Sequence, residues 1–134
     1  MATIFTKIIN GEIPSYKIAE NEEFYAFLDI SPLTNGHTLV VPKIEVDYIF
    51  DIDDDVLARM MVFSKKVAKA IELVVACERV GVVVIGLEVP HAHIHLIPIN
   101  GMDDMNFANP KLKLNQEEFL EISENINSTF DSLI

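Results

Sequence analysis

The sequence lacks the features that mark secreted and membrane-spanning proteins. It has one cysteine, Cys77, which cannot form an intramolecular disulfide and which we expect to act as a small buried hydrophobic residue. No apolar run approaches the roughly 18 residues of a membrane span, and no basic region followed by a long apolar stretch opens the chain. We therefore expect a soluble protein that resides in the cytoplasm.

Positive charge is also scarce. The chain has 10 Lys and Arg against 21 Asp and Glu, which gives a net charge of -11. An acidic field of this size repels phosphate backbones, so we do not expect nucleic acid as a partner. A small phosphorylated ligand is still compatible with it, because groups that line a pocket outweigh distant, screened charges.

The hydrophobic content is ample for one folded unit. Half of the 134 residues are hydrophobic, and we expect a single domain over residues 1–134. Five segments favour β-strands, since they are rich in β-branched and aromatic residues between turn residues. They span residues 15–20, 24–30, 36–42, 79–86 and 90–99, and the short gap before the last one favours antiparallel pairing with its predecessor.

Three segments favour helices. A short one near the start carries apolar residues at helical spacing from Ile4 to Ile9. A long one follows the aspartates of residues 51–55, with apolar residues every three or four positions from Val56 to Val74. The last spans residues 115–134, where Asn115 and Glu118 have capping-box spacing. These elements predict an α+β fold, a five-stranded antiparallel sheet with one long internal helix and a C-terminal helix. An irregular segment over 101–114 is expected between the last strand and the C-terminal helix.

Three of the four histidines occupy alternate positions of "VPHAHIHLIPI", residues 89–99. In a strand, His91, His93 and His95 project from one face and their apolar neighbours from the other. A hydrophilic strand face or hydrogen-bonded core histidines would be a purely structural explanation. Clustered imidazoles, however, lower one another's proton affinity, and neutral imidazoles serve as ligands, bases or nucleophiles.

Two chemistries could use such a histidine face. Zinc is one, because imidazole is a common zinc ligand, but same-face neighbours on a strand lie about 6.5 to 7 Å apart and converge poorly on one ion. Nucleophilic catalysis is the other. One imidazole would attack phosphorus, a second would fix its tautomer, and a third would donate to a phosphate oxygen or leaving group.

Four blocks of the sequence resemble the histidine triad (HIT) family. "HAHIHLI" at 91–97 is similar to its signature of three histidines separated by apolar residues. "TIFTKIINGEIPS", "FYAFLDISP" and "NGHTLVVPK" resemble three upstream blocks of the family, in the same order. The resemblance covers most of residues 3–99 and implies a HIT-like fold.

The resemblance also implies a function, a nucleotide-binding enzyme that cleaves a bond at the α-phosphorus. His93 would be the nucleophile of a covalent nucleotidyl-histidine intermediate. His91 and His95 would orient it and contact phosphate, and His37 would buttress them, although a hydrogen-bonded strand histidine is an equal alternative for His37. Asp29 would bind ribose or, alternatively, form a turn. The apolar residues that would contact the base, each also compatible with ordinary core, are Phe5, Ile8, Leu28 and Ile30.

The sequence departs from the family at two places. Some relatives hold zinc with two cysteines and a histidine where this chain has Thr3, Thr6 and Glu45, so we expect no metal and no cofactor. The segment that directly precedes the triad has Leu87 and Glu88 where the family often has Gln and Ser or Thr. Two neutral donors to phosphate are therefore lost, and Glu88 could instead act as a base or bind a cationic amine leaving group.

These observations together favour a hydrolase of purine nucleotide conjugates of the nucleoside 5′-phosphoramidate type. Cleavage of dinucleoside polyphosphates is an alternative, and so is a nucleotide-binding or interaction protein with negligible catalysis. Because attack needs a neutral imidazole, activity should fall in acid. The resemblance further implies a homodimer.

Overall fold

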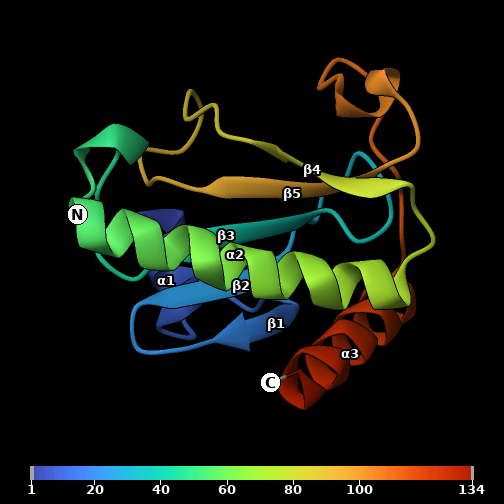
Figure 1. Cartoon of the computed structure of the whole chain (residues 1–134), viewed down its shortest axis with the longest axis horizontal. Helices are drawn as coiled ribbons and strands as arrows, with labels where there is room; N and C mark the ends of the chain where they lie inside the picture. The colour runs from blue at the N-terminus through green and yellow to red at the C-terminus, as the bar shows by residue number, and fades with distance from the viewer. Residues whose placement is uncertain (1, 134) are drawn as a thin grey trace.

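A computed structural model describes residues 2–133, and its five strands form one antiparallel sheet (Figure 1). The order across the sheet is β1-β2-β3-β5-β4. The strands are β1 Lys17–Glu20, β2 Phe24–Leu28, β3 Thr38–Pro42, β4 Arg79–Val83 and β5 Ile94–Ile99. The predicted five-stranded antiparallel sheet is confirmed, and β4 lies at its edge with β5 as its strand partner.

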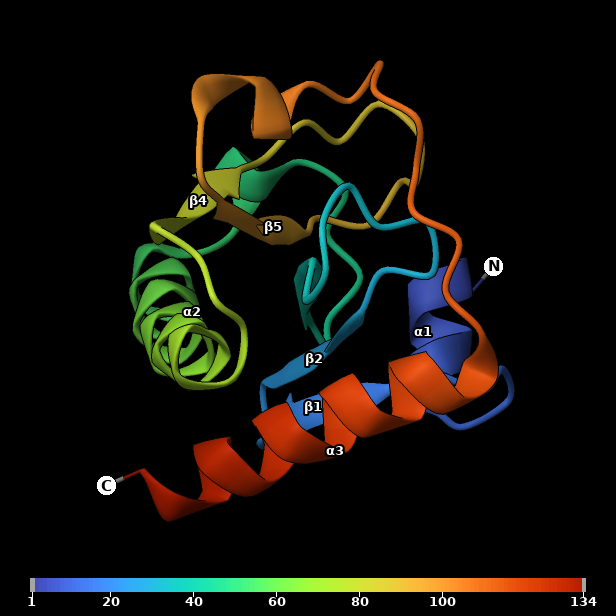
Figure 2. The ribbon, with the colours of Figure 1, turned by 90° about the vertical axis from the view of Figure 1, so that its right-hand side faces the viewer.

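Two long helices cover one face of the sheet, and a short one lies against the other (Figures 1 and 2). The helices are α1 Ile4–Ile9, α2 Asp54–Val74 and α3 Gln116–Ser132. The buried residues of α2 recur at the predicted spacing, with Met60, Phe63 and Val67 facing the core. The predicted capping box of α3 forms, since the Asn115 side chain accepts from Glu118 N and the Glu118 side chain accepts from Asn115 N.

The alternation of side chains along the strands separates two apolar clusters. On β2, Phe24, Ala26 and Leu28 join the large cluster beneath α2 and α3, whereas Tyr25 and Phe27 join the small cluster against α1. Ala92, Ile94 and Leu96 likewise face the large cluster. The histidines between them therefore face the side of the sheet where α1 lies.

Several sequence-based boundaries differ from the structure. β1 and β3 each begin two residues later than predicted, and β4 ends at Val83 instead of residue 86. β5 begins at Ile94 instead of residue 90, so His91 lies in a bend and His93 directly precedes the strand. β2 ends at Leu28 instead of residue 30, because Asp29 enters a turn in which Ser31 N donates to the Asp29 carboxylate. α3 ends at Ser132, and residue 134 of the predicted helix lies outside the described residues.

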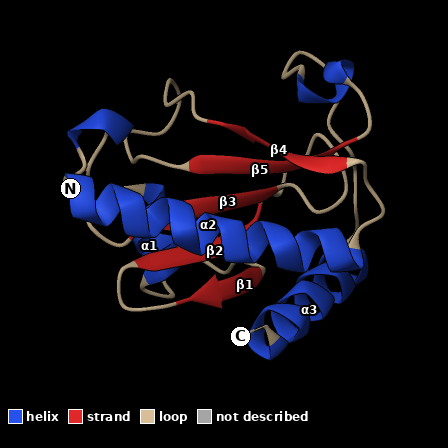
Figure 3. Ribbon diagram, viewed as in Figure 1, coloured by secondary structure: helices blue, strands red, loops and turns tan. Residues whose placement is uncertain are grey.

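The connections are mostly irregular (Figure 3). Short 3-10 turns form at Ile49–Asp51 and Met102–Met105, and the rest of residues 101–114 has no regular structure, as predicted. Cys77 is half-buried, so the prediction of a buried small hydrophobic residue was wrong. No helix among residues 2–133 is long and apolar enough to cross a membrane.

Candidate active site

A hollow of about 470 Å³ opens on the α1 side of the sheet, and we call it the triad hollow. It takes side chains from α1, the turn after β2, the loop between β4 and β5, β5 itself and the segment after Gly101. Its polar lining residues are Asp29, Ser31, Glu88, His93, His95 and Lys111. Segments far apart in the sequence thus converge on two of the three triad histidines.

The tautomer of His93 follows from its hydrogen bond to the main chain. His93 Nδ1 lies 2.7 Å from the carbonyl oxygen of His91. A carbonyl can only accept, so Nδ1 carries the proton and neutral His93 has its lone pair on Nε2. Nε2 makes no hydrogen bond to any residue of the described chain, and the ring packs edge-to-face on Phe5 with 5.0 Å between centroids. The ring is therefore held with a nucleophilic nitrogen free.

His95 receives the opposite tautomer through His37. Leu33 N donates to His37 Nδ1 over 3.0 Å, so the proton of neutral His37 lies on Nε2. That Nε2 donates to His95 Nδ1 over 3.0 Å, which leaves His95 with its proton on Nε2. The chain of bonds starts at a main-chain amide and ends with an N–H of a residue that lines the triad hollow. His95 is thereby made a hydrogen-bond donor.

Both members of this pair are neutral at pH 7. Burial lowers the pKa of His37 to about 3, and repulsion from His95 and Lys111 adds to the effect. Burial, with a contribution from His93, lowers the pKa of His95 to about 4. The 3.7 Å separation between His37 Nε2 and the Asp29 carboxylate is therefore not an ion pair. His37 thus contacts the triad directly, through the ring of His95.

His91 is fully buried and does not line the hollow. Its Nε2 donates to the carbonyl oxygen of Pro42 over 2.8 Å, so its Nδ1 accepts from the Thr3 hydroxyl over 2.7 Å. Burial lowers the pKa of His91, although the Pro42 carbonyl and Glu45 oppose this. Since protein groups occupy both ring nitrogens, the ring cannot contact a phosphate. Its carbonyl instead orients His93.

The residues at the position of the family's zinc site form a hydrogen-bonded cluster. The Thr6 hydroxyl donates to the Glu45 carboxylate over 2.6 Å, and Thr3 N donates to the same oxygen over 2.8 Å. Threonine hydroxyls are not zinc ligands in proteins, where Cys, His and carboxylates predominate. With His91 Nδ1 bonded to Thr3, this donor set does not fit zinc.

A second group of possible metal ligands consists of Asp29, His37 and His95, whose donor atoms lie within 4.8 Å of one another. Here too the hydrogen bonds oppose a metal. His37 Nε2 carries a proton because Nδ1 accepts from the main chain, and a metal requires a lone pair at that atom. Burial raises the pKa of the Asp29 carboxyl, which the amide of Ser31 partly offsets.

The predicted base-contacting residues are not brought together. Phe5 lines the triad hollow, as does Asp29 beside it. Ile8 packs against the small apolar cluster, and Leu28 faces the large cluster on the opposite side of the sheet. The Leu28 side chain therefore does not reach the hollow, contrary to expectation. Ile30 is exposed and lies between two lining residues, Asp29 and Ser31.

Among the lining residues that sequence reasoning missed are Phe107 and Lys111. Both belong to the irregular segment after Gly101, which matches no motif. The Phe107 ring lies edge-on to His95, with 5.1 Å between centroids. They are separated from the triad along the chain and lie in a segment without a periodic pattern. The sequence therefore held no signal that could have placed them in the triad hollow.

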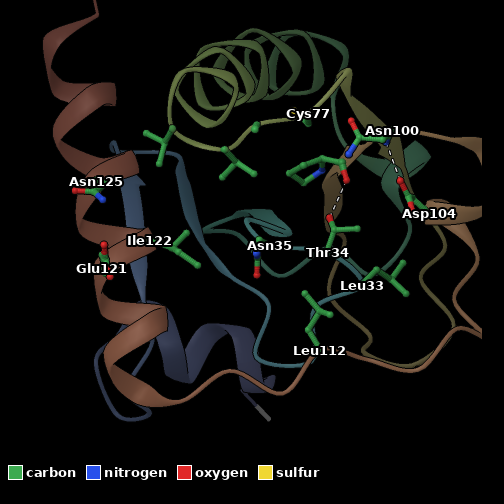
Figure 4. A pocket seen from close by; sticks show the side chains of 14 residues that line it. Leu33, Thr34, Asn35, Cys77, Asn100, Asp104, Leu112, Glu121, Ile122 and Asn125 are labelled. Atoms are coloured by element: carbon green, nitrogen blue, oxygen red, sulfur yellow. Dashed lines mark hydrogen bonds between the residues drawn. The ribbon is translucent and has the colours of Figure 1, made fainter.

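A larger hollow of about 550 Å³ lies between the end of α2 and α3 (Figure 4). Cys77, Asn35 and Asn125 are among its lining residues, and no triad histidine is. Several of its polar groups already have protein partners. The Thr34 hydroxyl donates to the Pro98 carbonyl over 2.7 Å, and Asp104 accepts from Asn100 N over 2.7 Å. The triad hollow, in contrast, is lined by His93 and His95.

Comparison with known proteins agrees with this arrangement of histidines. A family profile described as HIT domain matches residues 10–102. The chain belongs to the HIT family. This HIT protein is 39% identical over 132 residues to an uncharacterised HIT-like protein of Borreliella burgdorferi, covering 92% of this chain and 95% of the relative.

Two further relatives of this HIT protein carry informative names. An adenosine 5′-monophosphoramidase of Schizosaccharomyces pombe is 35% identical over 131 residues, covering 96% of this chain and 98% of the relative. The crystal structure of a hypothetical histidine triad nucleotide-binding protein of Sulfolobus tokodaii has a TM-score of 0.82 at 29% identity, covering 96% of this chain and 92% of that one. The HIT-like α+β fold predicted from the sequence is thereby confirmed.

Proposed function

We propose that this HIT protein hydrolyses purine nucleotide conjugates of the nucleoside 5′-phosphoramidate type through a nucleotidyl-histidine intermediate on His93. The observation that carries the proposal is the bond from His93 Nδ1 to the His91 carbonyl, which leaves the Nε2 lone pair free beside the triad hollow. The similarity to an adenosine 5′-monophosphoramidase supports the choice of substrate class. The cytoplasmic location expected from the sequence is part of the same proposal.

The first step would be attack of His93 Nε2 on the α-phosphorus. The new N–P bond uses the imidazole lone pair, and the P–N bond of the substrate breaks with its electron pair on the departing amine, which takes up a proton from solvent. The positive charge that develops on the ring is stabilised by the His91 carbonyl, 2.7 Å from Nδ1. Water then attacks the same phosphorus, which releases the nucleoside monophosphate and restores His93.

The other residues would position the nucleotide. The Nε2–H of His95 would donate to a phosphate oxygen, since the bond from His37 fixes its proton on that atom. Asp29 would accept from the ribose hydroxyls, and Phe5 and the exposed Ile30 would contact the base. His91 and His37 act through their neighbours as positioning residues, because neither lines the hollow.

The test is turnover of an adenosine 5′-phosphoramidate with a fluorescent amine. Wild-type protein should release the amine, and His93→Ala should lower kcat/KM at least about a thousandfold while AMP binding persists. A rapid alkaline quench followed by mass spectrometry should find AMP attached to the peptide that contains His93. Adenylylation of any other residue would contradict the proposed nucleophile, and AMP binding by wild-type protein without turnover would favour the binding-protein alternative.

We further propose that the protein forms a homodimer through the edge of β4. Val82 on this strand is exposed, and no strand pairs with β4 on its outer side in the described chain. Beside it lies a hollow of about 430 Å³, the apolar hollow, whose lining includes Tyr48, Phe50, Met61 and Ile85. An open strand edge next to exposed aromatic residues is typical of a surface that pairs with another chain.

A further inference from the structure

The segment after Gly101 closes one side of the triad hollow. Its ends are tied to the body of the protein, since Leu112 N donates to the Pro32 carbonyl over 2.9 Å and Gly101 follows β5 closely. Within it, Asn109 Nδ2 donates to the Asp103 carbonyl over 2.7 Å. Phe107 packs edge-on against both His95 and His37, at centroid distances of 5.1 and 6.2 Å. The segment is therefore docked on the triad.

This docking brings one cation, Lys111, into the lining of the hollow. Its ammonium donates to the main-chain carbonyls of Phe107 and Asn109, the latter over 3.0 Å. A lysine ammonium has three N–H donors, so one is left for a ligand. The two carbonyls hold the charge in place, which reduces the side-chain entropy lost when a ligand binds.

Lys111 matters for the binding of an anion because the other charged side chains that line the triad hollow are acidic. Among the described lining residues Lys111 is the one Lys or Arg, against the acidic Asp29 and Glu88. His95, with its lowered pKa of about 4, adds no positive charge at pH 7. An anionic ligand that enters between two carboxylates needs a compensating charge, and the neutral amide and hydroxyl donors of other family members are replaced by Leu87 and Glu88.

We propose that Lys111 binds the phosphate of the nucleotide and thereby compensates for the donors lost at Leu87 and Glu88. The inference rests on the proposed function, since it takes a nucleotide as the ligand of the triad hollow. Lys111 is then a substrate-binding residue that determines specificity for phosphorylated over unphosphorylated nucleosides. Its charge already acts on the site, because it opposes the burial-driven rise in the pKa of Asp29 and adds to the burial-driven fall in the pKa of His37.

The test compares binding of AMP with binding of adenosine by calorimetry, which separates phosphate recognition from recognition of the nucleoside. Lys111→Met keeps most of the aliphatic length and removes the charge, and it should weaken AMP binding roughly tenfold or more while adenosine binding is unchanged. Lys111→Arg should retain most of the AMP affinity. Lys113→Met is the matched control, since Lys113 is exposed on the same segment and does not line the hollow.

Each other outcome has a definite meaning. Unchanged AMP affinity in Lys111→Met would overturn the inference and leave the proposed function intact. Equal losses for AMP and adenosine would show that Lys111 only holds the segment in place, which also overturns it. Failure of the wild-type protein to bind either ligand would overturn the proposed function together with the inference.

Discussion

Main-chain groups set the hydrogen-bonding roles of the triad side chains. The carbonyl of His91 fixes the proton of His93 on Nδ1, and the amide of Leu33 fixes that of His95 on Nε2 through His37. Main-chain groups cannot change between donor and acceptor, whereas a side-chain hydroxyl can. The tautomers of His93 and His95 are therefore specified by the fold itself.

His91 uses groups of both kinds, since the Pro42 carbonyl fixes its proton on Nε2 and the Thr3 hydroxyl donates to its Nδ1. Thr3→Val would remove the donor to the buried His91 Nδ1 and the acceptor for Thr6 N, so we expect the free energy of unfolding to fall by about 1–3 kcal/mol. Thr3→Ser keeps the hydroxyl and should lose much less. Urea denaturation of the three proteins at pH 7 measures both effects, and equal losses for Val and Ser would show that the hydroxyl contributes nothing.

At the level of elements, the sequence predicted the sheet and helices well because their patterns are local. The apolar spacing of α2 and the capping box of α3 depend on residues a few positions apart. The start of β5 was placed too early because it depends on a distant partner. Pro42 has no N–H to extend the ladder of β3, and its carbonyl accepts from the His91 ring instead of from a strand amide.

The same distinction applies to the site. His93, His95 and His37 were predictable because the motif blocks that contain them are short and ordered. Phe107 and Lys111 were not, because their position depends on how an irregular segment docks on the completed sheet. The prediction for Leu28 failed on the alternation of β2, since the side chain of Phe27, not that of Leu28, faces α1.

The burial of His37 and His95, which are bonded to each other between the start of β3 and β5, makes the free energy of unfolding depend on pH. In the unfolded chain both imidazoles titrate near about 6.5, whereas in the folded protein their pKa values are about 3 and about 4. Between these pH values the unfolded chain binds more protons than the folded protein. The contribution of the two imidazoles to the free energy of unfolding is therefore fully present above about pH 6.5 and is lost as the pH falls toward 4 and 3.

We therefore expect the free energy of unfolding to decrease from pH 6 to pH 5 by roughly 1.4 kcal/mol per pH unit for each imidazole that stays neutral. Urea denaturation across this range measures the slope. Asp29 acts in the opposite direction, because burial raises its pKa and stabilises the protonated form. Proton resonances of His37 and His95 in the folded protein should not titrate in this range, and titration of either one near pH 6.5 would contradict the expectation.

At the scale of the whole molecule, the net charge of -11 opposes self-association, whereas the edge of β4 and the apolar hollow favour it. Like charges on two copies repel, but screening at physiological salt limits this repulsion to about 8 Å. The apolar hollow and the strand edge act at contact and are not screened. The short-range attraction should therefore determine assembly at physiological salt.

The proposed dimer can be tested at Phe50, which is 72% exposed beside the apolar hollow. Phe50→Asp adds a charge to the surface and should shift the protein to monomer, as measured by size-exclusion chromatography with light scattering. Leu120→Asp is the control, since Leu120 is partly exposed on α3, away from the β4 edge, and should leave the dimer unchanged. A monomeric wild-type protein would refute the proposed assembly.

Three residues, Ile85, Gly86 and His93, line both hollows, so the two cavities share a wall. A nucleotide on one side and a second copy on the other would then contact the same two segments of the chain. By thermodynamic linkage, whatever factor the nucleotide imposes on association, association must impose on nucleotide affinity. Protein concentration would then regulate the nucleotide affinity of this site, as a small-molecule effector does in other proteins.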